Sequence, residues 1–190
     1  MTKVAVVFAN GCEEVEGLTQ IDVLRRMQIP VDMVGLGSKN IMGAHNIPLT
    51  CDKVVDQSLL DYDCVVFPGG MGGAHALRDN DQLKDLMVQR QQAGKWNAAM
   101  CAAPIAFARY GLLDGHDYTC FPGIDKETKE VAPTGHFKED ITVVDEAGHI
   151  ITSRGPATAL AFAFRIAETL GYDTKEIRHQ MLYDFLAKNI

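Results

Sequence analysis

The stretch Ala98-Ala99-Met100-Cys101-Ala102-Ala103-Pro104 predicts a short buried strand, 97–101, that turns sharply into a helix. Proline is common in the first helical turn, because the N–H group that it lacks would have no partner there. Other short apolar runs, at 4–8, 31–36 and 64–67, alternate along the chain with stretches of helical spacing. This alternation is typical of a mostly parallel β-sheet that is covered by helices, an α/β fold.

The first predicted helix follows the strand at 4–8 and ends before Pro30. Its apolar residues recur at three-residue steps, which indicates a stripe that is buried against the sheet. These residues are Val15, Leu18, Ile21, Leu24 and Met27. Helical spacing also predicts helices at 79–92, 157–170 and 174–186.

Hairpins and loops are expected between these elements. The turn-rich stretch 37–50 predicts a loop or a hairpin, and 141–144 with 149–152 predicts a hairpin. The stretch 116–136 is the least regular and is expected to hold a short strand and a long loop. Because the chain contains no linker, repeat or low-complexity segment, we expect residues 1–190 to form a single domain.

Composition limits the classes of function. Of the 190 residues, 47% are hydrophobic and 23% are charged, as in ordinary globular proteins, and the net charge of −7 disfavours nucleic-acid and anionic-membrane partners. No apolar run approaches the roughly 20 residues of a membrane span, and the N-terminal run is too short for a signal peptide. Five cysteines without a C-x-x-C pair argue against a disulfide framework. We therefore expect a cytoplasmic protein with free thiols.

Cys101 is the first candidate for chemistry. A residue at a strand-to-helix turn lies at the carboxyl edge of the sheet, where open α/β folds bind ligands. The helix N-terminus is expected to lower the pKa of its thiol and to favour the thiolate. The alternative is that Cys101 is a small buried apolar residue, as most free cysteines are.

Two further segments fit a reactive Cys101. Gly69 and Gly70 end another strand, and backbone N–H groups at such a turn bind a developing oxyanion, although glycines also serve simple tight turns. Glu16 opens the first helix near acidic neighbours that suit the helix dipole. If Glu16 faces the thiol, it is expected to be partly protonated and to move a proton.

Other site classes are not indicated. No histidine is placed beside Cys101 by position or periodicity, as a histidine-assisted cysteine nucleophile would require. Metal-ligand spacing is missing, so no metal is expected. The glycines match neither a P-loop nor a dinucleotide fingerprint, so no cofactor is expected.

Four segments together resemble one family. They are Glu13-Glu14-Val15-Glu16, Phe67-Pro68-Gly69-Gly70, 98–104, and Thr152-Ser153-Arg154-Gly155-Pro156-Ala157-Thr158. In order and spacing they resemble the ThiJ/PfpI superfamily, in the branch of the Parkinsonism-associated deglycase (DJ-one) and its bacterial relatives. The resemblance runs from Val4 to about Leu182. It implies a homodimer and a flavodoxin-like three-layer sandwich of the class I glutamine amidotransferase type, with helices on both faces of a mostly parallel sheet.

The resemblance also implies roles for residues of the site. Cys101 corresponds to an oxidation-sensitive nucleophile, and Glu16 to the glutamate that hydrogen-bonds it. Gly69, Gly70 and the backbone of Ala102 match the turn that binds an oxyanion.

Further positions match the family near the pocket. Arg154, Gly155 and Pro156 match a segment next to the site, and Arg154 is expected to bind substrate. Arg26 and His45 fall where some relatives carry arginines near the pocket and the dimer interface, so His45 is a second substrate-binding candidate.

Two positions depart from family patterns. The human-type protein has a histidine before the loop proline, whereas Phe121 precedes Pro122 here, which argues against a histidine-assisted mechanism. The protease-like branch has a histidine directly after the cysteine, whereas this chain has Ala102. Peptidase activity is therefore not expected.

The sequence leaves two functions open. In the preferred one, Cys101 attacks a small reactive carbonyl compound such as methylglyoxal, or a glycated thiol or amine, as in a glutathione-independent glyoxalase or deglycase. In the other, the protein is an oxidation-sensing or chaperone-like stress protein, whose Cys101 becomes a sulfinate without turnover. The same residues serve both hypotheses, so the sequence does not separate them.

Overall fold

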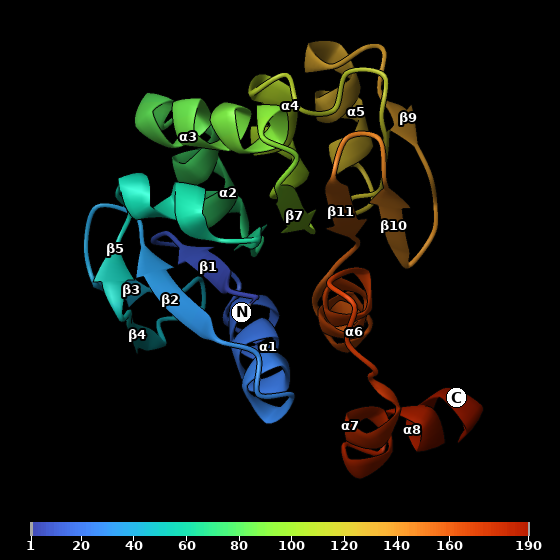
Figure 1. Cartoon of the computed structure of the whole chain (residues 1–190). Helices are drawn as coiled ribbons and strands as arrows, with labels where there is room; N and C mark the ends of the chain where they lie inside the picture. The colour runs from blue at the N-terminus through green and yellow to red at the C-terminus, as the bar shows by residue number, and fades with distance from the viewer. Residues whose placement is uncertain (1, 190) are drawn as a thin grey trace.

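The computed structural model describes residues 2–189 and places a seven-stranded sheet at its centre (Figure 1). The strands of this sheet are β1 (Val4–Phe8), β2 (Val31–Gly35), β5 (Lys53–Val54), β6 (Cys64–Phe67), β7 (Trp96–Met100), β10 (Thr142–Asp145) and β11 (Ile150–Ser153). Their order is β10-β11-β7-β6-β1-β2-β5. All neighbours pair in parallel except β10 with β11. The predicted mostly parallel sheet is confirmed.

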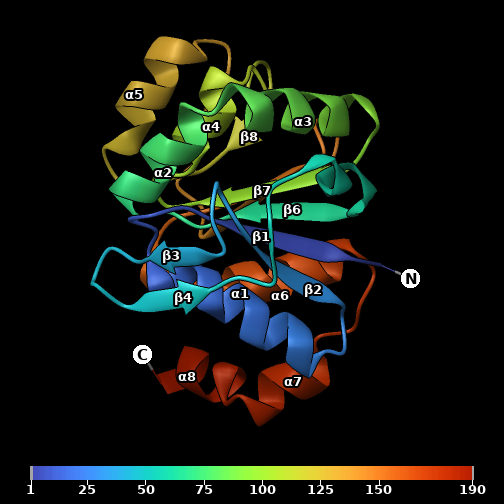
Figure 2. The ribbon, with the colours of Figure 1, turned by 90° about the vertical axis from the view of Figure 1, so that its left-hand side faces the viewer.

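Helices cover both faces of the sheet, as Figures 1 and 2 show. One face carries α1 (Glu14–Arg26) and α6 (Ala159–Thr169). The other carries α2 (Met71–Arg78), α3 (Asp81–Gln92), α4 (Pro104–Arg109) and α5 (Ile124–Val131). The last helices, α7 (Lys175–Gln180) and α8 (Tyr183–Asn189), lie outside α1 and α6 (Figure 2). The expected three-layer sandwich is therefore confirmed.

Short elements complete the fold. Strands β3 (Asn40–Met42) and β4 (Pro48–Thr50) form an antiparallel hairpin within the turn-rich stretch, and β8 (Asp117–Tyr118) pairs in parallel with β9 (His136–Phe137). The predicted hairpin at 141–152 is confirmed as β10 and β11. Two 3₁₀ turns, Gln57–Asp61 and Pro156–Thr158, precede β6 and α6.

The core is divided by the sheet. Successive side chains of a strand point to opposite faces, so β1 contributes Ala5 and Val7 to one apolar cluster and Val4, Val6 and Phe8 to the other. All five residues are buried, as expected for a central parallel strand. Within residues 2–189, no helix has the length and apolar character needed to cross a membrane.

The predicted stripe on α1 is wrong at its start. Val15 is 54% exposed and Leu18 is 37% exposed, whereas Glu14, Glu16 and Gln20 are buried. The Gln20 amide donates hydrogen bonds to the Glu16 carbonyl and to a backbone carbonyl of α6. The first turns of α1 therefore turn their polar face inward, toward the edge of the sheet, and leave apolar residues outside.

Three helical features were not predicted. Helix α2 begins at Met71 in a glycine-rich segment, and α5 lies in the stretch that was expected to be an irregular loop. The single helix predicted at 174–186 is broken into α7 and α8, with Leu182 between them at a φ of 56°. A left-handed residue interrupts the run of α-helical dihedrals, so one continuous helix is excluded.

Candidate active site

The carboxyl ends of β6, β7 and β11 meet at one edge of the sheet, because these three strands are parallel neighbours. Gly69 and Gly70 follow β6, Cys101 follows β7, and Arg154 follows β11. The topology therefore gathers three of the predicted segments, and α1 brings Glu16 to the same edge. This is the location where open α/β sheets bind ligands.

Cys101 sits in a strained turn between β7 and α4. Its φ is 60°, a left-handed value that is uncommon for a residue with a side chain. The turn is held on both sides, since the Cys101 N–H donates to the Ser153 carbonyl at 3.0 Å and the Cys101 carbonyl accepts from the Phe121 N–H at 2.9 Å. Such local strain clusters at functional sites. Cys101 is also the one cysteine of the five that is not fully buried.

The Gly69–Gly70 turn packs directly against Cys101 and Glu16. A Cβ atom at Gly69 would lie 2.6 Å from the Cys101 Cβ, 2.7 Å from Glu16 Oε2 and 3.0 Å from the Cys101 Sγ. At Gly70, whose φ is 81°, a Cβ would lie 2.4 Å from the Gly11 carbonyl oxygen. Both glycines are therefore needed for close approach: Gly69 approaches the predicted reactive groups, and Gly70 approaches the backbone before α1.

Glu16 is fully buried beside the thiol. Its Oε2 accepts a hydrogen bond of 2.7 Å from the Gly69 N–H, whereas its Oε1 has no hydrogen-bond partner among the described residues. Burial raises the pKa of Glu16 to about 7, although hydrogen bonds from Cys101 and Gly69 act in the opposite direction. The expectation of a partly protonated glutamate facing Cys101 agrees with this environment.

Burial also raises the pKa of the Cys101 thiol, to about 12, and the Glu16 carboxylate contributes to the rise. The backbone N–H groups of Gly70 and Ala102 lower it in part by hydrogen bonding to the sulfur. The predicted depression of the thiol pKa by a helix N-terminus is therefore wrong for the resting protein. Helix α4 begins only at Pro104, and burial together with the negative charge of the Glu16 carboxylate disfavours a thiolate at Cys101.

The N–H donors of the site divide into two sets. The N–H groups of Gly70 and Ala102 favour negative charge on the sulfur of Cys101, next to the place where the oxyanion of a carbonyl adduct would form. Gly69 uses its N–H group for Glu16. Of the three predicted oxyanion donors, two therefore face the reacting atom and the third orients the carboxyl group.

A cavity of about 470 Å³ opens in front of Cys101. Its lining is mostly apolar and comes from the first residues of α2 and α5 and from the segments that precede α1, α2, α4, α5 and α6. The lining residues are Glu13, Gly70, Met71, Cys101, Ala102, Phe121, Pro122, Ile124 and Pro156. Its volume lies in the range of small-molecule sites.

His45 and the acidic start of α1 form a neighbouring cluster. His45 Nδ1 lies 2.8 Å from Glu14 Oε2 and 3.8 Å from Glu13 Oε1, and the hydrogen bond with Glu14 raises the pKa of His45. Glu14, which the helix dipole alone seemed to explain, is buried, and Gly43 packs against its carboxylate. His45 itself lies outside the lining of the Cys101 cavity, which it approaches only through Glu13.

Arg154 lies next to the Cys101 cavity but does not line it. It lines a shallow depression of about 200 Å³ that shares Phe121, Pro122 and Pro156 with the Cys101 cavity. Its Cζ lies 5.8 Å from the centre of the Phe137 ring, and its Nη2 is 3.7 Å from Glu139. Arg154 therefore borders the site without touching Cys101.

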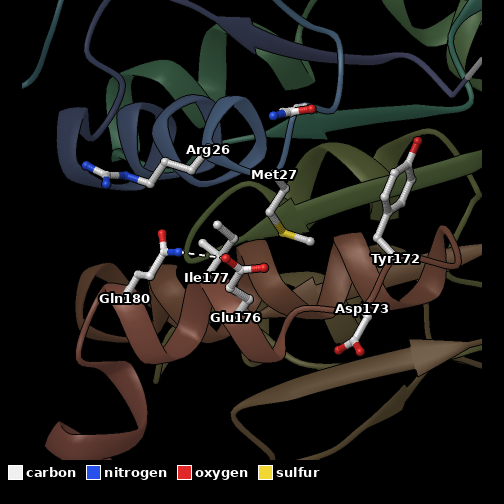
Figure 3. A pocket seen from close by; sticks show the side chains of 8 residues that line it. Arg26, Met27, Tyr172, Asp173, Glu176, Ile177 and Gln180 are labelled. Carbon is white, nitrogen blue, oxygen red and sulfur yellow. Dashed lines mark hydrogen bonds between the residues drawn. The ribbon is translucent and has the colours of Figure 1, made fainter.

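Arg26 is remote from Cys101. It pairs with Asp22 at 2.9 Å and lines a separate, polar cavity of about 380 Å³ between the end of α1 and α7. Figure 3 shows this cavity, with Tyr172 and Glu176 on its other side. Arg26 therefore does not join the site within one chain.

Several lining residues were missed in the sequence. Met71 and Ile124 belong to the two helices that were not predicted, so nothing in the pattern placed them near Cys101. Glu13 lines the cavity beside the predicted Glu16, and Phe121 was noted only for the histidine that it replaces. The sequence offered only a phenylalanine next to a proline as a signal for an apolar wall, and the exposure of that phenylalanine is a finding of the structure.

Comparisons with known proteins agree with this geometry. The family model described as DJ-1/PfpI family matches residues 2–169. A Drosophila melanogaster protein, dj-1beta, is 37% identical over 167 residues, which is 87% of each chain. The Danio rerio Parkinson disease protein 7 homolog is 35% identical over 176 residues, again 87% of each chain.

Solved structures show the same fold. The crystal structure of Drosophila melanogaster DJ-1beta superposes with a TM-score of 0.87 at 34% identity and covers 96% of this chain and 98% of that one. Toxoplasma gondii DJ-1, in a structure described as oxidized, superposes with a TM-score of 0.86 at 29% identity and covers the same shares. The flavodoxin-like architecture expected from the sequence is confirmed.

Proposed function

The chain belongs to the DJ-1/PfpI family, and on that premise we propose that it is a stress-response enzyme that converts reactive 2-oxoaldehydes without a cofactor. One observation carries this proposal: Cys101, Gly70 and Ala102 line one cavity, and the carboxyl group of Glu16 lies buried against the Cys101 thiol behind it. These are a nucleophile, a proton carrier and an oxyanion site, which together suit addition to a carbonyl group.

The first step is addition to the aldehyde. Glu16 takes the thiol proton as the sulfur of Cys101 forms a bond to the aldehyde carbon, and the N–H groups of Gly70 and Ala102 stabilise the resulting oxyanion. A pKa of about 7 suits Glu16 as a base at neutral pH. The fully buried position of Glu16 protects the transferred proton from exchange with solvent.

The remaining steps are an internal redox reaction and a hydrolysis. The hydrogen of the aldehyde carbon moves with its bonding electrons to the adjacent ketone carbon as the oxyanion becomes the thioester carbonyl, and protonated Glu16 gives its proton to the former ketone oxygen. The first carbon is oxidised to a thioester while the second is reduced to an alcohol. Water then cleaves the thioester, which frees the thiol and a 2-hydroxy acid. Overall, R–CO–CHO and water give R–CHOH–COO⁻ and a proton, so no external oxidant or reductant is needed.

The test is the rate of methylglyoxal consumption by the purified protein. Cys101→Ala and Glu16→Gln should each lower the rate to the buffer level, because they remove the nucleophile and the base. Cys51→Ala, which removes another free thiol, should retain it. A full rate in Cys101→Ala would refute the proposal. Release of lactate from methylglyoxal-treated thiols or amines would extend the activity to the deglycase type.

Oxidation sensing is a second candidate, favoured by the partial exposure of Cys101 and by the oxidized state named for the Toxoplasma gondii relative. Hydrogen peroxide would add one oxygen to the sulfur and release water, and a second peroxide would give the sulfinate. Protonated Glu16 would donate a hydrogen bond to this group. Intact-mass analysis after peroxide treatment should then show two added oxygens in the wild type and none in Cys101→Ala.

We also propose that two copies of the chain associate through the exposed apolar start of α1. Val15 and Leu18 lie outside on this helix, and the adjoining β3–β4 hairpin exposes Met42 and Ile47. Backbone hydrogen bonds join the hairpin to the segment before α1, so these side chains belong to one surface. Contiguous exposed apolar patches of this kind mark interfaces. Sedimentation should show a dimer for the wild type and a monomer for Leu18→Glu; a monomeric wild type would refute this.

A further inference from the structure

The Cys101 cavity is larger and more apolar than methylglyoxal requires. Met71, Phe121, Pro122, Ile124 and Pro156 form its wall away from the reacting groups. A three-carbon aldehyde would occupy only a small part of the roughly 470 Å³, and would leave most of this wall in water. The space beyond the reacting carbonyl is therefore available for a larger substituent.

Phe121 and Met71 are placed to contact such a substituent. They are large apolar residues, 44% and 46% exposed, that border the cavity from the loop before α5 and from the start of α2. The position of Phe121 is tied to the nucleophile, because its N–H group donates to the carbonyl of Cys101. The ring of Phe121 packs closely against Gly155, since a Cβ atom at Gly155 would lie only 3.2 Å from Cδ2 of Phe121. A group on the carbon next to the reacting aldehyde would therefore meet a rigid aromatic surface.

The charge of the cavity points to an uncharged substituent. Of the lining residues, Glu13 brings a carboxylate, and none is a lysine, an arginine or a histidine. Its backbone N–H group is already engaged with the Gly69 carbonyl, so Glu13 offers the cavity mainly its acidic side chain. His45, 3.8 Å from the Glu13 carboxylate, and Arg154, in the adjoining depression, both lie outside this lining. A negatively charged group inside the cavity would therefore meet the Glu13 carboxylate and would lose hydration against apolar side chains.

We propose that this cavity selects 2-oxoaldehydes that carry an aryl or branched alkyl group without charge, and that Phe121 and Met71 determine this specificity. The proposal rests on the proposed function, since it names the substrate class of the same Cys101 reaction. The reaction balance is unchanged: the substituent R takes no part in bond formation, and R–CO–CHO and water give the corresponding 2-hydroxy acid.

The test compares three probes: phenylglyoxal, methylglyoxal and 4-carboxyphenylglyoxal. Formation of the 2-hydroxy acid is followed by chromatography, and Cys101→Ala serves to subtract the reaction of these probes with arginines. We expect kcat/KM for phenylglyoxal to exceed that for methylglyoxal by about tenfold or more, the discrimination that apolar pockets achieve. The carboxylated probe should fall at least about tenfold below phenylglyoxal.

Variants distinguish the effect of the cavity wall from the intrinsic reactivity of the two probes. Intrinsic reactivity is the same for every variant, so it cancels when the ratio of kcat/KM for phenylglyoxal to kcat/KM for methylglyoxal is compared between proteins. Phe121→Ala and Met71→Ala should each lower this ratio by about five- to tenfold. Val131→Ala, which removes an equally exposed side chain of α5 outside the cavity, should leave it unchanged. Both Phe121 and Met71 are half-exposed, so these substitutions spare the core.

Each outcome discriminates between the two proposals. A ratio that is the same in all variants, or a wild-type preference for methylglyoxal, overturns the specificity proposal and leaves the proposed function standing. Efficient turnover of the carboxylated probe overturns the assignment of an uncharged substituent. If no probe is turned over faster in the wild type than in Cys101→Ala, the proposed function fails, and the specificity proposal fails with it.

Discussion

Replacement of Glu16 by glutamine should stabilise the protein at pH 8 even though it removes the proposed base. Glu16 is fully buried, and burial raises its pKa from 4.5 to about 7. At pH values between 4.5 and about 7, Glu16 is therefore protonated in the folded state and ionised in the unfolded state, so the folded state binds more protons. The stabilising contribution of the protonated carboxyl group is therefore complete below pH 4.5 and is lost as the pH rises through about 7.

The magnitude follows from the pKa difference. Each tenfold change in proton affinity corresponds to about 1.4 kcal/mol, so ionisation of Glu16 lowers the free energy of unfolding by about 3 kcal/mol at pH 8. Glutamine has nearly the same shape, still accepts from the Gly69 N–H through its carbonyl oxygen, and carries no charge. For a chain of this length, Glu16→Gln should raise Tm by roughly 6–12 °C at pH 8.

The assay is urea unfolding, followed by circular dichroism at several pH values from 4.5 to 8. The difference in unfolding free energy between Glu16→Gln and the wild type should be near zero at pH 4.5, grow through pH 7, and level off above it. Glu130→Gln, a matched substitution at an exposed position of α5, should show no such trend. A difference that is absent at pH 8, or that is constant across the range, would refute the reasoning.

Three further predictions concern other parts of the chain. Gly69→Ala should lower kcat/KM for methylglyoxal by about a hundredfold, because the added Cβ would displace Cys101 and the carboxyl group of Glu16. A full rate in this variant would show that the close approach of Gly69 is dispensable. Arg90→Met should lower the free energy of unfolding, measured in urea, by about 3–5 kcal/mol. The reason is that the buried guanidinium of Arg90 donates hydrogen bonds to three backbone carbonyls and one side chain. A near wild-type stability would contradict this. In an NMR titration, His45 should show a raised pKa that returns toward 6.5 in Glu14→Gln, and an identical titration in both proteins would rule out the proposed pairing.

Local patterns were sufficient to predict the sheet and to single out the groups that the proposal assigns to the reaction. The continuous apolar runs at 4–8, 64–67 and 97–101 predict central parallel strands, since both faces of such strands are buried. The sharp turn after β7 marks Cys101, and the motif order across the chain marks Glu16 and the glycine turn. Each of these motifs consists of residues that are close together in the sequence, so sequence patterns alone identify it.

Helices α1 and α2 were less readable because distant contacts override their local preferences. On α1, the periodicity indicated a buried Val15, but the inward face is the polar one that carries Glu16. On α2, Gly72 and Gly73 disfavour a helix by propensity. The helix forms there because its backbone packs closely on the segment before α1, where a Cβ at Gly73 would lie 2.8 Å from the Cys12 Cα.

By itself, then, the sequence determined the α/β class and the family, and it suggested the pair of residues proposed to react, all of which rest on short motifs and their order. Only the tertiary structure decided the raised pKa of Cys101, the N–H groups that face its sulfur, and the apolar wall made by Met71 and Phe121. The physical reason is that desolvation and cavity shape arise where segments remote in the chain pack together. A helix dipole argument from neighbouring residues predicted the wrong direction for the thiol, because burial beside a carboxyl group outweighs it.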